Sequence, residues 1–249
     1  NAVLHDIEAP IVLGDTLSPL GKELRGFDLV LTNPPFGTKR GGERTTRDDL
    51  TFPTSNKQLN FLQHIYRSLK PGGRAAVVLP DNVLFADGDG RRIREDLMDK
   101  CNLHTILRLP TGIFYAQGVK SNVLFFERGK TDKGNTEGVW FYDLRTDMPS
   151  FGKRTPLTAE HFADFEAAYT ATERDAIEDD RWSYLTRVEV SAKEDSLDLG
   201  LMRAAESSLD FANLDPAQIT QEAADLLAEA VDLLRTLSAE LGANTSEAG

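Results

Sequence analysis

Residues 27–37 read Phe-Asp-Leu-Val-Leu-Thr-Asn-Pro-Pro-Phe-Gly, and this stretch decides the fold. The apolar run before Asn33 is typical of a buried strand in a parallel sheet. Pro34 and Pro35 fix φ and lack backbone donors, so the chain leaves the strand as a stiff, extended hook. Open α/β sheets bind ligands at the carboxyl ends of their strands, which is where this hook stands.

The hook carries two side chains suited to a flat ligand with an amino group. Asn33 offers one acceptor and two donors, and Phe36 offers an aromatic face. Together they suit a planar group with an exocyclic amine, such as an adenine turned out of its stack. The tetrapeptide alone also fits the start of an ordinary loop. The apolar strand before it strengthens the interpretation as a ligand site.

Composition narrows the class of protein. The chain has 249 residues, of which 40% are apolar, so we expect one large domain or one domain with an appendage. No apolar run reaches the length of a membrane span, and no secretory pattern opens the sequence. A single cysteine, Cys101, and four scattered histidines give no disulfide and no metal constellation. We therefore expect a cytoplasmic protein without a metal site.

Charge is unevenly distributed along the chain. Residues 1–154 hold 22 Lys+Arg and 19 Asp+Glu, whereas residues 155–249 hold 6 and 21. The first part can approach a polyanion. The second part should be repelled by one, so it faces solvent or a protein partner.

The first part of the chain alternates strands and helices. Apolar runs predict strands at residues 11–13, 27–32, 75–80, 104–110, 121–126 and 139–144, the last as an edge strand. Residues 75–80 are continuously apolar, which predicts a sheet covered on both faces. Helices are predicted at residues 55–69, with Ser55 as N-cap, and at residues 91–100. About ten residues separate the strands at 104–110 and 121–126, too few for a helical crossover, so this pair should be antiparallel.

The tail has two helical patterns. Thr158 can cap a helix that places Phe162, Phe165 and Tyr169 on one face, and the charged residues 173–181 look exposed. Asp215-Pro216 is a strong helix start. The helix that follows has apolar residues that repeat every 3.5 residues on average: Ile219, Ala223, Leu226, Ala230, Leu233 and Leu237.

Several motifs in a fixed order narrow the family. They are Asn33 to Gly37, Asn60-Phe61, Leu-Lys-Pro-Gly-Gly-Arg at 69–74, Val78-Leu79-Pro80, Leu84-Phe85, Arg108-Leu109-Pro110 with Phe114, and Asn122 to Phe126. This set resembles the modification (M) subunit of type I restriction-modification systems, an N6-adenine DNA methyltransferase. The resemblance covers residues 11–145 well and the tail more loosely.

The resemblance implies an α/β fold, the class I (Rossmann-like) sheet of S-adenosylmethionine-dependent methyltransferases. Those enzymes begin with a strand and a Gly-rich loop that holds the cofactor, and residues 1–249 contain no such loop at the start. Gly14-Asp15 resembles a later position, where an acidic residue contacts the cofactor's adenine. We therefore expect a carboxyl-terminal part of a longer subunit, incomplete at the N-terminus, that binds S-adenosylmethionine weakly or not at all by itself.

The resemblance also assigns roles to site residues. Phe36 would stack on a flipped adenine, while the Asn33 side chain and the Pro34 carbonyl accept its two N6 hydrogens. In the loop after Phe36, the basic residues Lys39, Arg40, Arg44 and Arg47 would contact DNA phosphates beside the target base. A solvated loop is an equally good interpretation of those four residues.

We expect three segments along the chain and a protein partner for the last of them. Residues 1–152 would form the carboxyl-terminal part of the catalytic domain, residues 153–214 a mixed linker, and residues 215–249 a partner helix with a frayed tail. The resemblance implies that this helix binds the specificity (S) subunit, which supplies the DNA sequence preference, and it admits a restriction (R) subunit as a further partner. Packing of the helix on its own domain is the alternative.

Two other functions fit parts of the sequence. A glutamine-N5 methyltransferase acting on proteins could use the same hook, although those enzymes typically carry tyrosine after the prolines and lack a long acidic tail. A non-catalytic assembly module would explain the missing Gly-rich loop. The order of motifs favours the DNA methyltransferase.

Overall fold

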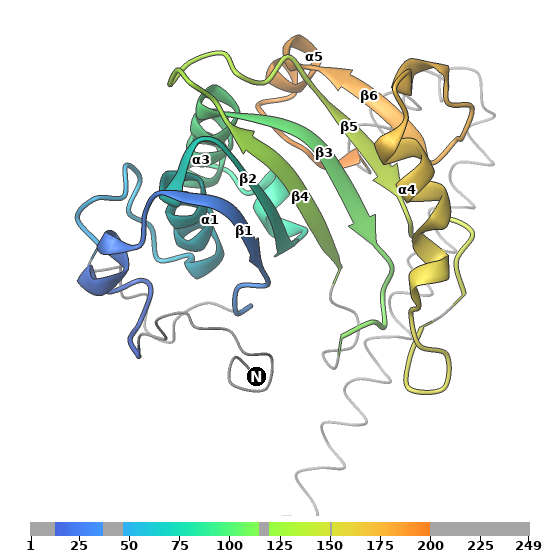
Figure 1. Cartoon of the computed structure of the whole chain (residues 1–249), viewed down its shortest axis with the longest axis horizontal. Helices are drawn as coiled ribbons and strands as arrows, with labels where there is room; N and C mark the ends of the chain where they lie inside the picture. The colour runs from blue at the N-terminus through green and yellow to red at the C-terminus, as the bar shows by residue number, and fades with distance from the viewer. Residues whose placement is uncertain (1–12, 37–46, 115–119, 150, 200–249) are drawn as a thin grey trace, which may run out of the picture. The chain divides into compact units, whose positions relative to one another are not determined.

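The computed structural model describes residues 13–36, 47–114, 120–149 and 151–199 (Figure 1). The chain divides into two compact units, Asn1–Asp198 and Leu199–Gly249, and the following strands and helices belong to the first unit. Its strands are β1 (Phe27–Thr32), β2 (Leu69–Pro80), β3 (Cys101–Leu109), β4 (Ser121–Arg128), β5 (Gly138–Asp143) and β6 (Trp182–Thr186). Its α-helices are α1 (Lys57–Ser68), α2 (Asn82–Phe85), α3 (Asp89–Lys100), α4 (Ala163–Thr170) and α5 (Arg187–Ala192). Short 3-10 helices lie at Pro19–Glu23, Ala159–Phe162 and Arg174–Ala176.

The described strands form one mixed sheet in the order β1-β2-β4-β3-β5-β6. The pairs β1/β2 and β3/β5 are parallel, whereas β4 is antiparallel to both β2 and β3. The predicted antiparallel pair is therefore confirmed. Strands β1, β2, β3 and β5 all point the same way, so their carboxyl ends meet at one edge of the sheet.

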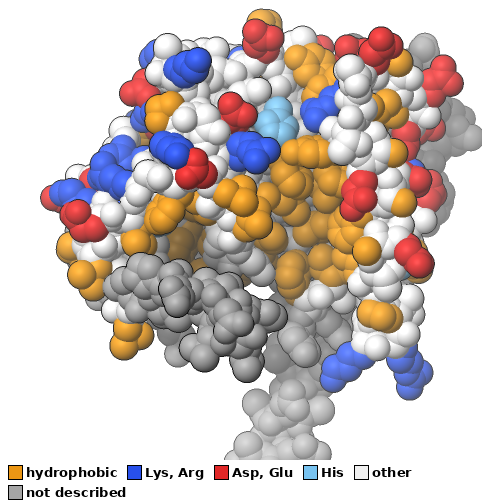
Figure 2. All heavy atoms as spheres, in the orientation of Figure 1, with side chains coloured by type: hydrophobic (Ala, Val, Ile, Leu, Met, Phe, Trp, Pro, Cys, Tyr) orange, Lys and Arg blue, Asp and Glu red, His pale blue; other side chains and the backbone are white. Residues whose placement is uncertain are grey.

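The two faces of the sheet are covered differently. Helices α1 and α3 pack behind β2, β4 and β3, and α4 lies across the other face near β5 (Figure 1). On β4, Leu124 and Phe126 are buried, while the alternating Val123 and Phe125 are only partly covered. Figure 2 shows apolar side chains gathered over these middle strands, beside α4. On β2 and β4 the described residues thus bury one face and cover the other only partly, whereas the sequence predicted a sheet covered on both faces.

Helix α1 begins one residue later than predicted. Asn56, not Ser55, is the N-cap, and its side chain accepts a hydrogen bond from the backbone N–H of Leu59 at 3.2 Å. Asn and Ser cap almost equally well, so local chemistry alone does not choose between them. The helix then packs behind the sheet with Leu62 and Tyr66 wholly buried.

Strand β6 comes from the segment predicted to be a linker. It pairs with β5 in the antiparallel sense, so β5 is not the edge strand that the sequence predicted. Trp182 of β6 stacks on Trp140 of β5 with ring centroids 4.8 Å apart. The sheet therefore extends past the expected domain boundary at residue 152.

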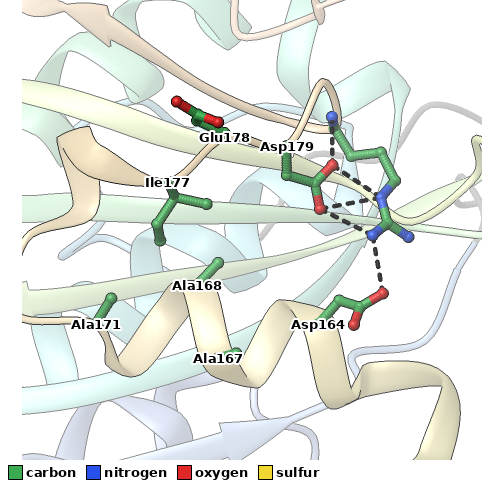
Figure 3. Close-up of a pocket in the computed structure, with 8 residues that line it drawn as sticks. Asp164, Ala167, Ala168, Ala171, Ile177, Glu178 and Asp179 are labelled. Atoms are coloured by element: carbon green, nitrogen blue, oxygen red, sulfur yellow. Dashed lines mark hydrogen bonds and ion pairs between the residues drawn. The ribbon is translucent and has the colours of Figure 1, made fainter.

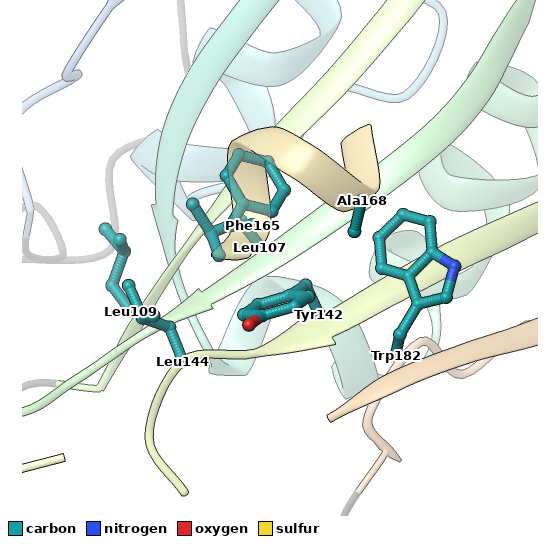
Figure 4. Packing of buried hydrophobic residues seen from close by; sticks show 7 residues of the cluster. All are labelled: Leu107, Leu109, Tyr142, Leu144, Phe165, Ala168 and Trp182. Carbon is teal, nitrogen blue, oxygen red and sulfur yellow. The ribbon is translucent and has the colours of Figure 1, made fainter. Parts of the chain in front are cut away.

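An aromatic core holds β6 and α4 to the sheet. Phe165 and Ala168 of α4 face Tyr142 of β5 and Trp182 of β6 across this core (Figure 4). The core is completed by leucines of β3 and of the turn after β5: Leu107, Leu109 and Leu144. Thr158 caps the helical segment before α4 through a capping box with His161, as its sequence position predicted.

Removing the Trp182 side chain tests whether β6 belongs to the cooperative unit. We expect Trp182→Ala to lower the free energy of unfolding by about 3–5 kcal/mol, because it leaves a cavity in a packed aromatic core. Val188, which is 78% exposed on α5, provides the control, and Val188→Ala should cost less than about 0.5 kcal/mol. Denaturant unfolding measures both. Equal stabilities of the two variants would show that β6 unfolds apart from the sheet.

Candidate active site

The Asn-Pro-Pro-Phe hook lies where the sequence predicted it, at the carboxyl end of a parallel strand. Thr32, the last residue of β1, pairs with Val77 of β2. Pro34 is buried, Asn33 is exposed, and Phe36 is half-buried. The buried proline anchors the hook and leaves the Asn33 side chain available for a ligand.

Phe36 has an aromatic neighbour from a distant part of the chain. Its ring meets that of Phe114 edge-to-face, with centroids 5.9 Å apart and an interplanar angle of 78°. Phe114 belongs to the connection that follows β3. Gly112, two residues earlier, has φ of +82°, and a Cβ there would lie 2.2 Å from the carbonyl oxygen of Phe151. Glycine is therefore required for the turn that delivers Phe114 to the hook.

Asp81 lies at the same edge of the sheet, directly after β2. Its carboxylate accepts two hydrogen bonds from Arg145, at 2.9 and 2.6 Å, and one from the Asn122 amide at 2.8 Å. Burial raises the pKa of Asp81, but the Arg145 and Asn122 contacts outweigh burial and hold the pKa below its usual range. Asp81 is thus an ionised structural group.

A second ion pair stands beside the first. Arg108 at the end of β3 donates to Asp143 at the end of β5 at 2.7 Å, and the two residues are register partners on parallel strands. The other oxygen of Asp143 accepts from the backbone N–H of Arg145 at 3.1 Å. The carboxyl ends of β2, β3 and β5 are therefore joined by two ion pairs and the backbone hydrogen bond that links them.

Arg47 is not placed as a phosphate contact. Its side chain is 2% exposed and binds both oxygens of Asp49, and its Nη1 donates to the Thr16 carbonyl at 2.9 Å. The Arg47 contact holds the pKa of Asp49 down at about 2, against the opposing effect of burial. These contacts argue against the predicted DNA role of Arg47. The other three basic residues, Lys39, Arg40 and Arg44, lie outside the described part of the chain.

Asp15 lies in a turn before the 3-10 helix at Pro19–Glu23. It is exposed, and its Oδ1 accepts a hydrogen bond from the backbone N–H of Leu17 at 2.9 Å. A carboxylate oriented in this way can accept a hydrogen bond from an amine or hydroxyl donor, and the cofactor contact of Asp15 stays a prediction. The predicted strand at residues 11–13 lies almost entirely outside the described residues.

Two surface grooves lie away from these residues. The larger, of about 520 Å³, runs between α4 and residues 177–181, where Asp179 and Asp164 both bind the Arg181 guanidinium (Figure 3). The smaller, of about 370 Å³, is lined by His104, Trp140 and Tyr184 among others. Neither groove includes a predicted site residue. In the described residues no His, Cys, Asp or Glu cluster could hold a metal, and no helix is long and apolar enough to cross a membrane.

The sequence profile of the N-6 DNA Methylase family matches residues 1–210. The chain belongs to this family. It is 46% identical to the StySPI methylase subunit of a type I restriction enzyme from Salmonella potsdam, covering 98% of this chain and 53% of that protein. It is also 46% identical to the EcoKI methylase subunit from Escherichia coli strain K12, covering 98% of this chain and 54% of that protein.

Solved structures agree with this family. The crystal structure of the EcoKI M protein matches with a TM-score of 0.71 and 48% identity, covering 80% of this chain and 49% of that one. A structure described as showing assembly and conformational transition of the type I R-M system matches with a TM-score of 0.67 and 27% identity, covering 92% and 51%. The sheet is thus that of a class I methyltransferase, and the chain spans about half the length of the curated relatives it matches.

The buried His64 and the half-buried His104 make stability depend on pH. Burial, together with the nearby positive charge of Arg47, lowers the pKa of His64 to about 4. Burial, together with the positive charge of Arg174, likewise lowers the pKa of His104 to about 4. Unfolded histidine has a pKa of about 6.5. Between these values the unfolded chain binds more protons than the folded one, so stability falls as pH drops from 6.5 towards 4.

We expect His64→Gln and His104→Gln each to reduce the slope of melting temperature against pH in that window. The wild-type slope over the same pH window is the reference for both variants. Calorimetric melts from pH 7.5 to pH 4.5 measure these slopes. An unchanged slope in the double variant at His64 and His104 would show that neither histidine is held neutral.

Proposed function

We propose that this chain carries the catalytic edge of an N6-adenine DNA methyltransferase, as the modification subunit of a type I restriction-modification system. The observation that carries the proposal is the Asn-Pro-Pro-Phe hook at the carboxyl end of β1, with Phe36 beside Phe114. Membership of the N-6 DNA Methylase family supports the same reaction. The substrate is an adenine extruded from duplex DNA.

The hook positions the reacting nitrogen. The Asn33 side-chain oxygen and the Pro34 carbonyl accept the two N6 hydrogens, which aims the nitrogen lone pair at the methyl donor. Both acceptors also offset the positive charge that develops on N6 during transfer. Because Asn33 is exposed at the strand end while Pro34 is buried, the amide meets the base from a fixed backbone.

The aromatic residues offset the cost of extruding the base. Unstacking and unpairing cost roughly a few kcal/mol, and stacking on an aromatic ring returns about 1–3 kcal/mol per base. Phe36 is half-buried and packs edge-to-face with Phe114, so its ring orientation is set before the base arrives. An edge-to-face partner also leaves a ring face for the adenine.

S-adenosylmethionine is the methyl donor in this proposal, and it supplies the methyl group from its sulfonium sulfur. The Asp15 side chain, exposed and oriented by the Leu17 N–H, is the residue among those described that suits the cofactor's adenine amine. Lys39, Arg40 and Arg44 would neutralise phosphates beside the target base. The excess of basic over acidic residues in positions 1–154 supports that DNA contact.

The tail is proposed to bind the partner that selects the DNA sequence. The apolar seam from Ile219 to Leu237 fits a helix of the S subunit, and the acidic composition of residues 155–249 disfavours DNA there. A structural relative described as showing assembly of the type I R-M system supports a multi-subunit protein. A restriction subunit is a further partner, and the cytoplasm, where the DNA is, is the expected location.

The hook is tested in the natural-length protein with its partner. We expect Asn33→Ala to reduce methyl transfer by about 100-fold or more, because it removes a charge-stabilising acceptor at the reacting atom. Phe36→Ala should lose less, since stacking is worth about 1–3 kcal/mol. Transfer of a radiolabelled methyl group to unmethylated DNA measures both. Asn102→Ala provides the control, because Asn102 is exposed at the opposite end of β3. Near-normal transfer by Asn33→Ala would refute the site.

The partner helix is tested by deleting residues 215–249. We expect the shortened protein to keep its fold but to lose association with the S subunit, since burying Leu226, Leu233 and Leu237 contributes about 1.5–3 kcal/mol each. Co-purification at equal stoichiometry measures association, and circular dichroism checks the fold. Recovery of a stoichiometric complex without residues 215–249 would assign the helix to the protein's own core.

A further inference from the structure

Arg145 binds three segments that meet at the active-site edge of the sheet. It lies two residues after β5, and its side chain is 15% exposed. Its Nε donates to the Leu109 carbonyl at 2.9 Å, and its Nη2 donates to the Ser121 carbonyl at 3.0 Å. Nη1 and Nη2 also donate to the Asp81 carboxylate, at 2.9 and 2.6 Å respectively.

Two of these hydrogen bonds are made to the two ends of the connection between β3 and β4. Leu109 is the last residue of β3, Ser121 is the first of β4, and they are register partners. The backbone N–H of Asp81 also donates to the Lys120 carbonyl at 3.1 Å, just before β4 begins. The Arg145–Asp81 pair thus fixes where the β3–β4 connection leaves the sheet and where it returns.

That connection carries Phe114. Only four residues separate Leu109 from Phe114, and they include Pro110, with its fixed φ, and Gly112, which packs on the Phe151 backbone. Little conformational freedom remains between the anchored strand end and the ring. The position of Phe114 beside Phe36 therefore depends on the anchor at Leu109.

The anchor needs a guanidinium. Arg145 makes a two-point contact with Asp81 and reaches two carbonyls at once, which suits a planar fork of five donors. A lysine ammonium is a point charge with a different reach, so it could keep the ion pair but not all of the carbonyl contacts. Asn122, wholly buried on β4, completes the set by donating to Asp81 at 2.8 Å.

We propose that Arg145 is a positioning residue for methyl transfer: together with Asp81 it holds both ends of the β3–β4 connection, so that Phe114 keeps Phe36 oriented for the target base. The proposal rests on the proposed function of the Asn33 hook. Arg145 contacts neither the base nor the methyl donor in this account. It acts through the aromatic pair.

The chain offers a matched control at the other end of the same two strands. Arg128, at the end of β4, pairs in register with Cys101 at the start of β3. Its side chain is 17% exposed, and its Nη1 donates to the Lys100 carbonyl at 2.6 Å and to that of Thr131 at 3.2 Å. It likewise binds a carboxylate, that of Asp132. Arg128→Lys therefore removes a similar set of contacts far from the hook.

The experiment compares Arg145→Lys, Asp81→Asn and Arg128→Lys in the natural-length protein with its partner. For the first two we expect kcat for methyl transfer to fall about 10- to 100-fold, since misplacing an orienting group by about 1 Å costs this much. KM for S-adenosylmethionine should stay within about twofold, and the double variant should lose no more than Arg145→Lys alone, because both act through one contact. Arg128→Lys should keep kcat within about twofold.

Hydrogen–deuterium exchange supplies a measurement that does not depend on activity. Arg145→Lys and Asp81→Asn should speed exchange of the amides at residues 111–114, whereas Arg128→Lys should speed it only near residues 129–135. Unchanged exchange at 111–114, or an unchanged kcat, in both edge variants overturns the positioning role. If the wild-type protein methylates no adenine, the proposed function fails, while the exchange result still decides whether Arg145 holds the Phe114 turn.

Discussion

The bidentate ion pair between Arg145 and Asp81 is the contact on which the active-site edge depends. It joins residues 64 positions apart in the sequence and also holds the main chain at the ends of β3 and β4. The pair lies partly buried, and removing one partner would leave the other charge poorly compensated, a cost of several kcal/mol in buried pairs. The pair therefore holds the hook, the Phe114 turn and the strand ends in one arrangement.

The hook and the antiparallel pair could be predicted from the sequence because both follow from local constraints. Pro34 and Pro35 end the strand and extend the chain whatever surrounds them, so Asn33 had to stand at a strand's carboxyl end. The connection between β3 and β4 is too short for a helical crossover, which left only the antiparallel pairing. Strand geometry then brought the carboxyl ends of β1, β2, β3 and β5 to one edge.

The features that the sequence missed all depend on distant partners. Strand β6 follows a charged stretch, and its place in the sheet depends on pairing with β5 and on the stacking of Trp182 on Trp140. Arg47 looked like its basic neighbours. Asp49 lies only two residues away, but the burial of Arg47 also depends on the distant Thr16 and His64. Phe114 lies shortly after a glycine in a loop, which is a usable sequence signal for an aromatic residue at the site. Its contact with Phe36 could not be predicted, because the contact depends on the fold.

The most direct test is nucleoside analysis of DNA from cells that produce the natural-length protein with its partner. We expect N6-methyldeoxyadenosine in that DNA, and an amount lower by about 100-fold or more when the Asn33→Ala variant replaces the wild type. Mass spectrometry of digested DNA and of total cell protein would be run on the same cells. A methyl group on protein glutamine, with none on adenine, would contradict the account and assign the hook to an amide nitrogen.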